Sequence, residues 1–369
     1  MFMKTSRYLV ILMMVLLTSQ LIAQEEENEA QATQTQVLKA TSKYDFVPGE
    51  TVIFYDDFSQ DQIGDYPALW NTDGSGEIVT LNNYPGKWLQ PGTDCSQIPV
   101  IKKEFPDNYT VEFDVVPMPG PNGEESIQFG FYIYSALNPD DFNEGGAIPG
   151  VSGIKMTFGS YTQYYSTYNE GAYVADAAID KNIFVINQKA RLSFSVQKTR
   201  IRAYVNDAKV FDVAKAMFPG VKYNVLRLIT NAEAMPLISN FRFAVGAPDM
   251  RNKLITEGKL VTYGIYFDSG SDKIKPESAG TLKMISDVLK ENPTVAITIV
   301  GHTDSDGDDA KNLDLSKRRA VSVKNVLSSE YGIEASRLQT DGKGETVPVA
   351  PNTSLEGKAR NRRVELIKI

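Results

Sequence analysis

Short segments in which hydrophobic and polar residues alternate recur between residues 44 and 247 of this sequence. In the segment YTVEFDVVP, the apolar residues Val111, Phe113 and Val115 fall on one face of a strand, and Glu112 falls on the opposite face. Residues two apart in a strand point to the same side, so this period predicts strands with one buried face. Because no helical period interrupts these segments, residues 44–247 are predicted to form an all-β sandwich.

A different pattern, in which strand and helix signals alternate, extends over residues 250–369. The segment PESAGTLKMISDVLKENP begins with Pro276, which fits the first turn of a helix, and carries apolar residues at helical spacing. The predicted elements are a strand at 260–270, a helix at 276–292, a strand at 295–304, a helix at 309–330, a strand at 337–340, a helix at 354–361 and a closing strand at 362–369. This order predicts an α/β sandwich as the second domain.

The first residues carry the pattern of an export signal. Lys4 and Arg7 precede an apolar run at 8–23 that ends in alanine. A basic start, an apolar core and a small final residue are typical of a cleaved signal peptide, and the run is shorter than the ~20 residues that span a bilayer. We therefore expect residues 1–23 to be removed on export to the periplasm, and the Glu- and Gln-rich residues 24–43 to form a linker.

Charge is distributed unevenly along the chain, whose formal net charge is −8. Residues 1–250 contain 19 basic and 29 acidic residues, whereas residues 251–369 contain 19 basic and 17 acidic residues. Domains that bind nucleic acid carry clustered Lys and Arg on one face. The acidic first part and the lack of a basic stripe in the sequence therefore argue against nucleic acid as a partner.

Few residues are available for metal or nucleophilic chemistry. His302 is the single histidine, which leaves no histidine cluster for a metal and makes a Ser-His-Asp hydrolase a poor fit. The acidic run at 304–309 resembles a calcium loop, but its glycine is Gly307, whereas the sixth position of such a loop falls on Asp309. Cys95 has no second cysteine to pair with and is predicted to be buried. The sequence predicts no cofactor and no metal site.

One acidic and one basic residue of the second domain suggest a binding pocket. Asp304 follows a predicted buried strand, and Arg319 lies fifteen residues later in the next predicted helix. A carboxylate can take an ammonium group while a guanidinium takes a carboxylate, so the pair could recognise a zwitterion. Asn312 and the free N–H groups at the start of the helix could add hydrogen bonds. Spacing alone leaves a structural salt bridge as the alternative.

At these residues the sequence resembles the OmpA-like peptidoglycan-binding domain, over roughly residues 258–369. The matching motifs are Phe267-Asp268, Gly301-His302-Thr303-Asp304, Gly307, Asn312, Leu315-Ser316, Arg319-Ala320, Val323 and Asn361-Arg362-Arg363-Val364-Glu365. So many fixed positions in register make the resemblance specific.

The resemblance implies that Asp304 and Arg319 clasp the free amino-acid head of diaminopimelate in the peptidoglycan stem peptide. Asn312 and Arg362 match family positions that line the same pocket, and Thr303 is expected to contribute. What is implied is equilibrium binding, with no bond made or broken. It also implies a protein of the Gram-negative cell envelope, located in the periplasm or associated with the periplasmic face of the outer membrane.

The first domain loosely resembles the concanavalin-like lectin and glucanase sandwich, which is a jelly-roll fold. Hydrolases among those relatives carry the motif E-x-D-x-x-E, and here Glu112 and Asp114 are present while Pro117 replaces the second glutamate. The tyrosines of the segment 160–168 could stack on sugar rings, but aromatic residues are also ordinary strand formers.

These observations favour a non-enzymatic protein that tethers an envelope component to the cell wall. The alternative is a protein whose β-sandwich binds or hydrolyses envelope polysaccharide, with the second domain as its wall anchor. A third hypothesis gives the sandwich a protein ligand, as in an adhesin.

Overall fold

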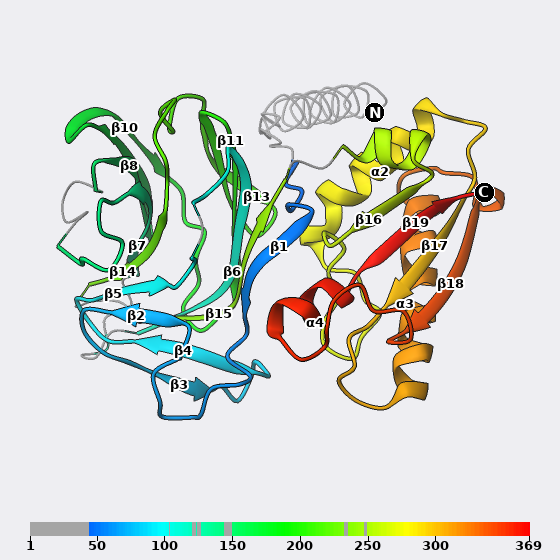
Figure 1. The fold of residues 1–369 in the computed structure, drawn as a ribbon, viewed down its shortest axis with the longest axis horizontal. Helices are drawn as coiled ribbons and strands as arrows, with labels where there is room; N and C mark the ends of the chain where they lie inside the picture. The colour runs from blue at the N-terminus through cyan, green and yellow to red at the C-terminus, as the bar shows by residue number, and fades with distance from the viewer. Residues whose placement is uncertain are drawn as a thin grey trace, which may run out of the picture. The chain divides into compact units, whose positions relative to one another are not determined.

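The computed structural model describes residues 44–369 apart from 103, 120–122, 124–126, 144–149, 232–234 and 247–248 (Figure 1). Residues 43–369 form one compact unit. The predicted signal peptide and linker lie outside the described residues.

Two antiparallel sheets account for the first part of the described chain. Within the described residues, sheet A follows the order β13-β12-β11-β6-β15-β4-β3, and β1 also pairs with β15. Its strands are β1 (Thr51–Asp56), β3 (Gly76–Thr80), β4 (Lys87–Pro91), β6 (Asn108–Met118), β11 (Ala190–Gln197), β12 (Arg200–Val205), β13 (Ala208–Val213) and β15 (Met235–Val245).

Sheet B follows the order β10-β9-β8-β7-β14-β5-β2. Its strands are β2 (Trp70–Thr72), β5 (Ser96–Pro99), β7 (Gln128–Ser135), β8 (Ser152–Gly159), β9 (Thr162–Asn169), β10 (Ala172–Asp180) and β14 (Val225–Thr230). Inward-facing side chains of both sheets share one hydrophobic core, which includes Phe113, Phe131, Phe158 and Phe194. An all-β first part is thereby confirmed, and we refer to sheets A and B together as the β-sandwich.

Strand β6 shows how the sequence pattern places side chains. Val111, Phe113 and Val115 are buried in the shared core, as their alternation predicts. Glu112 and Asp114 point to the other face of sheet A, yet they are buried as well. Charged side chains are almost never fully buried unless they are paired, so this face of the sheet must carry partners for them.

The second part of the described chain is built on sheet C, with the order β16-β19-β17-β18. Strands β17 and β18 are parallel, and the other two pairings are antiparallel. The elements are η1 (Asn252–Thr256), β16 (Lys259–Thr262), η2 (Pro276–Ser278), α2 (Ala279–Glu291), β17 (Ile297–His302), α3 (Asp309–Ser329), η3 (Ala335–Arg337), β18 (Leu338–Gly344), α4 (Leu355–Asn361) and β19 (Val364–Lys368). A second hydrophobic core joins this sheet to α2 and α3, so the predicted α/β second part is confirmed.

The predicted strand at 260–270 is wrong in its second half, because β16 ends at Thr262. The backbone N–H of Tyr266 donates to Ser278 Oγ, and its carbonyl accepts from the N–H of Lys275. Beyond β16, Phe267 forms only an isolated bridge with Ile274. The apolar residues that follow Thr262 therefore alternate along an irregular segment rather than along a continuous strand.

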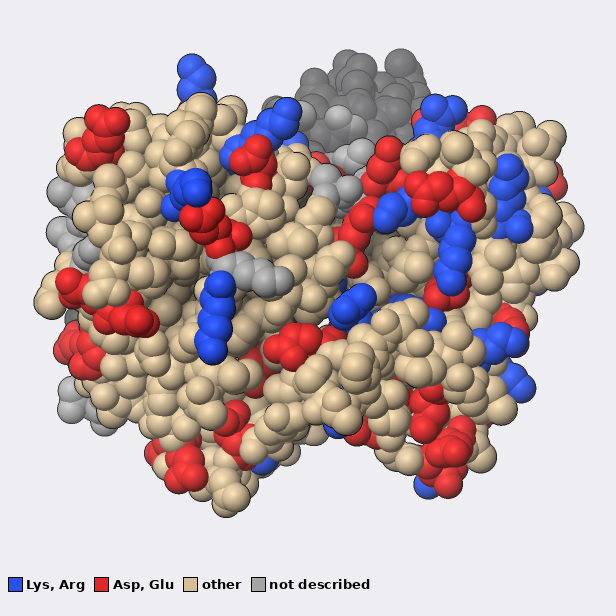
Figure 2. Space-filling view, in the orientation of Figure 1, with Lys and Arg blue, Asp and Glu red and all other residues tan. Residues whose placement is uncertain are grey.

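Among the described residues, no helix has the length and hydrophobicity needed to cross a membrane. Acidic and basic side chains are interspersed on the face in view in Figure 2, without a basic stripe. Cys95 is buried, as predicted.

Candidate functional site

The candidate site lies where β17 ends and α3 begins. Strand β17 runs through the core of the α/β part, so its last residues and the loop after it are held firmly. A Cβ at Gly301 would lie 2.2 Å from the carbonyl oxygen of Ser316, so only glycine lets α3 approach the strand this closely. Asp308 caps the helix by accepting a hydrogen bond from the N–H of Lys311. These local features fix the loop that carries Asp304.

Asp304 is 8% exposed, and both of its carboxylate oxygens have partners. Arg362 Nη1 donates to Asp304 Oδ2 at 2.6 Å, and the N–H of Asp306 donates to Asp304 Oδ1 at 3.1 Å. Arg362 lies between α4 and β19, so this ion pair joins the loop after β17 to the residues that precede β19. A charge-assisted bond of this length holds the carboxylate in one orientation.

Arg319 projects from α3 beside this pair and is half-buried. Its Nε donates to the carbonyl oxygen of Ser271 at 2.9 Å, and its Nη2 donates to that of Asp268 at 3.2 Å. The guanidinium lies over the ring of Phe267, with 4.8 Å from its carbon to the ring centroid. In the part of the chain that the structure describes, no carboxylate lies within 4.0 Å of Arg319. A guanidinium thus stands in the site without an anionic partner.

The charges of Asp304, Arg319 and Arg362 act on one another. Burial lowers the pKa of Arg319 to about 10, Asp304 opposes that shift, and Arg362 adds to it. Two guanidinium groups and one carboxylate therefore lie close enough at the site to influence one another. Such a site suits a small ligand that carries both an ammonium and a carboxylate group.

The other predicted site residues take supporting positions. Asn312 Nδ2 donates to the carbonyl oxygens of Asp304 at 3.4 Å and Asp306 at 3.0 Å, and to Glu345 Oε2 at 2.7 Å. Its amide therefore braces the loop that presents Asp304. Thr303 is buried, and its Oγ1 has no hydrogen-bond partner among the described residues.

His302 and its neighbours serve the framework. His302 Nε2 lies 3.6 Å from Glu365 Oε2, and Glu365 also pairs with Arg363 and Lys259, each at 2.8 Å. Burial acts to raise the pKa of Glu365, but these three partners outweigh it and hold that pKa well below its ordinary value. No group of three or more His, Cys, Asp or Glu side chains among the described residues could hold a metal ion.

Asn361 stabilises the turn before Arg362. Its Oδ1 accepts from the N–H groups of Val349 and Ala350 at 2.8 and 3.1 Å. Its Nδ2 donates to the carbonyl of Ala350 and to Asn352 Oδ1 at 2.8 and 2.7 Å. The side chain is fully buried, so solvent does not reach these four bonds.

We expect Asn361→Ala to lower the free energy of unfolding by about 2–3 kcal/mol, because it leaves buried backbone groups without partners. Urea denaturation of the full chain measures this loss. Asn325→Ala on the exposed face of α3 is the matched control and should leave the unfolding midpoint unchanged. Equal midpoints for the two variants would contradict the framework role of Asn361.

The structure places the predicted site residues of the β-sandwich in different environments. Tyr165 packs against Phe211 in the core, whereas Tyr161 is 75% exposed. Glu112 of the hydrolase-like motif is fully buried and bonded to Arg191, Arg242 and Tyr266, so it does not face solvent.

Sequence reasoning missed the residues that support the two site arginines from elsewhere in the chain. The ring of Tyr55, on β1, lies 5.0 Å from the guanidinium carbon of Arg362. The carbonyl oxygen of Ser271 accepts from Arg319. Neither residue stands in a motif, and a backbone carbonyl gives no signal in a sequence.

Comparison with known proteins finds the OmpA family at residues 266–362. Over 111 residues the chain is 44% identical to outer membrane porin F of Pseudomonas aeruginosa. The aligned region covers 30% of this chain and 32% of that protein. It is 46% identical over 102 residues to the probable lipoprotein YiaD of Escherichia coli, covering 28% of this chain and 46% of the relative. The chain thus spans less than half of the length of each of these curated relatives.

Among solved structures, the peptidoglycan-associated lipoprotein from Burkholderia pseudomallei is 27% identical to this chain. The match covers 33% of this chain and 98% of that structure, with a TM-score of 0.28.

Proposed function

From the premise that residues 266–362 are an OmpA family domain, we propose that this chain binds peptidoglycan non-covalently through the diaminopimelate of the stem peptide. Diaminopimelate in a stem peptide presents one free amino-acid head, which carries an ammonium and a carboxylate group. In this proposal the ammonium binds Asp304 and the carboxylate binds Arg319.

The observation that carries the proposal is the state of Arg319. Its guanidinium is half-buried, bonded to two backbone carbonyls and without a carboxylate within 4.0 Å among the described residues. A buried charge usually has a partner of opposite sign, because leaving water is costly. A ligand carboxylate would supply that partner, while the carboxylate of Asp304, held in place by Arg362, would receive the ligand's ammonium.

The relatives support a place in the cell envelope, since one is named an outer membrane porin and another a probable lipoprotein. We propose that the chain acts on the periplasmic side of the outer membrane and tethers an envelope component to the wall. The β-sandwich, for which a lectin-like jelly-roll fold stays a prediction, would carry the tethered component.

A glycan-hydrolysing sandwich is the less favoured function. Glu112 is enclosed by two arginines and a tyrosine, so it cannot reach a polysaccharide in this arrangement. Glycan binding by the exposed tyrosines of the β-sandwich stays open as a prediction.

The test is a calorimetric titration of the full chain with two muropeptides that differ only in the third residue of the stem. One carries diaminopimelate, and the other carries lysine, which lacks the second carboxylate. We expect the lysine form to bind at least about tenfold more weakly, because the partner of Arg319 is lost. Equal affinity for both muropeptides, or no binding of either by a folded chain, would contradict the proposal.

A further inference from the structure

Both arginines of the candidate site rest on aromatic rings, and the two rings come from different parts of the chain. Arg319 lies over Phe267 of the α/β part, whereas Arg362 lies over Tyr55 of strand β1 in sheet A. A guanidinium over the face of a ring is attracted by the ring's negative face, and the attraction grows when water is excluded. A side chain of the β-sandwich therefore touches a residue of the peptidoglycan site.

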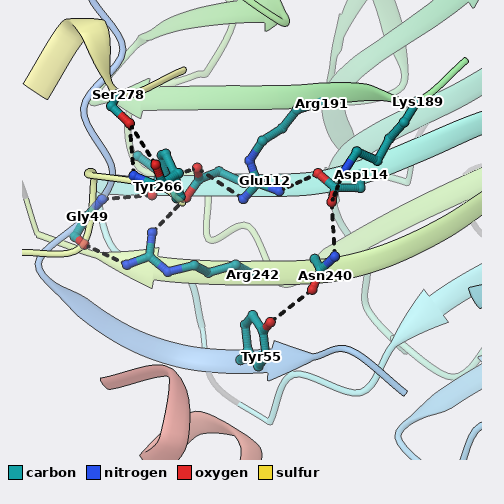
Figure 3. A network of polar contacts seen from close by, with 11 residues as sticks. Gly49, Tyr55, Glu112, Asp114, Lys189, Arg191, Asn240, Arg242, Tyr266 and Ser278 are labelled. Carbon is teal, nitrogen blue, oxygen red and sulfur yellow. Dashed lines mark hydrogen bonds and ion pairs between the residues drawn. The ribbon is translucent and has the colours of Figure 1, made fainter. Parts of the chain in front are cut away.

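A hydrogen bond of its hydroxyl group holds the ring of Tyr55 in place. Its Oη donates to Asn240 Oδ1 at 3.0 Å, and Asn240 Nδ2 donates to Asp114 Oδ2 at 3.0 Å, as Figure 3 shows. Burial raises the pKa of Tyr55 to about 12, so the hydroxyl keeps its proton and remains a donor. Asn240 has a φ of 51°, at the point where the pairing of β15 with β6 shifts register. The bulge thus aims the asparagine at the tyrosine.

The same polar network also extends to Tyr266, the residue before Phe267. Asp114 binds Arg191 at 2.7 Å, and Arg191 also pairs with Glu112 at 3.3 Å. Tyr266 Oη donates to Glu112 (Figure 3). Tyr266 directly precedes Phe267, whose ring lies beneath Arg319. The outer face of sheet A therefore contacts the supports of both arginines through hydrogen-bonded groups.

We propose that the β-sandwich takes part in wall recognition through Tyr55, which acts as a positioning residue for Arg362 against Asp304. The inference rests on the proposed function and deepens it, because it makes ligand affinity depend on a residue outside the OmpA family domain. Arg362 has its hydrogen bond to Asp304 through Nη1 alone. Without the ring beneath it, the long side chain would sample other rotamers and would no longer fix the carboxylate that receives the ligand's ammonium.

The test compares Tyr55→Leu, which removes the ring, with Tyr55→Phe, which keeps the ring and removes only the hydroxyl. Muropeptide affinity of the full chain is measured by calorimetry, and thermal unfolding checks that each variant is folded. We expect Tyr55→Leu to bind about three- to tenfold more weakly and Tyr55→Phe to stay within about twofold of wild type. Tyr132→Leu is the matched control, because Tyr132 packs under Lys155 on sheet B at 5.3 Å and has no contact with Arg362.

A second measurement needs no ligand. In chain labelled with nitrogen-15 at arginine, the Nε–H proton of Arg362 should show the ring-current shift of a group lying over an aromatic face. Its signal is assigned by its loss in Arg362→Lys. We expect the shift to remain in Tyr55→Phe and to vanish in Tyr55→Leu.

Wild-type affinity in Tyr55→Leu, or an unchanged Arg362 signal, would overturn the proposal. If the wild-type chain bound no muropeptide, the proposed function would fail, while the arginine signal would still decide whether Tyr55 positions Arg362.

Discussion

Replacing either Asp304 or Arg319 by alanine is expected to weaken diaminopimelate muropeptide binding at least about 30-fold. Losing one partner of a buried, hydrogen-bonded charge pair costs about 2–5 kcal/mol, and about 1.4 kcal/mol corresponds to a factor of ten. Arg319→Ala leaves the ligand carboxylate without its guanidinium. Asp304→Ala also leaves two guanidinium groups facing the ligand's ammonium, so repulsion adds to the loss. Calorimetric titration of the full chain measures both effects.

The helix supplies a matched control for Arg319. Arg318 is the preceding residue, is exposed, and pairs with Asp314 and Asp272, each at 2.8 Å. Arg318→Ala removes the same charge and the same number of atoms as Arg319→Ala. Because Arg318 is exposed, we expect its loss to change the affinity by no more than about twofold, as for a charge at the rim of an interface. Asp304→Asn separates the effect of losing the negative charge from the effect of losing side-chain volume, because asparagine has nearly the size and shape of aspartate. An Arg318→Ala loss as large as that of Arg319→Ala would show that general attraction, rather than the site, controls binding.

The largest loss of stability is expected from Glu112→Ala. Glu112 is fully buried, pairs with Arg242 at 2.6 Å and Arg191 at 3.3 Å, and accepts from Tyr266. Removing one partner of a buried ion pair leaves an uncompensated charge and costs about 3–5 kcal/mol. The guanidinium of Arg242 would be left buried without an ion-pair partner, because in the described ranges it has no other acidic group within 4.0 Å. Urea denaturation of the full chain should show this as a lower unfolding midpoint.

An exposed ion pair of the same sandwich is the control. Glu104 and Lys222 lie 3.1 Å apart, and both side chains are mostly exposed. Exposed pairs contribute little, so Glu104→Ala should not move the midpoint measurably. If Glu112→Ala were equally silent, the network in Figure 3 would not stabilise the fold.

The same network makes a prediction about acid. Burial acts to raise the pKa of Glu112 and of Asp114, but neighbouring cations, Arg191 foremost, outweigh it and hold both pKa values below their ordinary 4.5 and 3.8. A carboxylate whose pKa is depressed by folding stabilises the folded state fully above its unfolded pKa, and that stability is lost as pH falls through the folded pKa. Wild-type stability should therefore fall below about pH 4. Glu112→Gln should show a shallower fall, seen as a smaller change in midpoint between pH 6 and pH 3.

The sequence determined the features that depend on local pattern. The segment 301–323 predicted the loop after β17 and the helix that follows it, because glycines and capping residues act within a few positions of one another. The roles of Asp304 and Arg319 in binding stay a prediction. The α/β order of the second part followed from its periodicity for the same reason. The alternation in β6 likewise predicted which side chains enter the core.

Only the tertiary structure decided what lies on the other face of β6. Glu112 and Tyr266 are 154 residues apart, and no periodicity connects them. Local pattern placed Glu112 on the face opposite the core residues, and only the fold shows that arginines and a tyrosine bury this second face as well. In the same way, the motif named Arg362 but gave no sign of Tyr55, because contacts between distant segments depend on how completed sheets pack rather than on neighbouring residues.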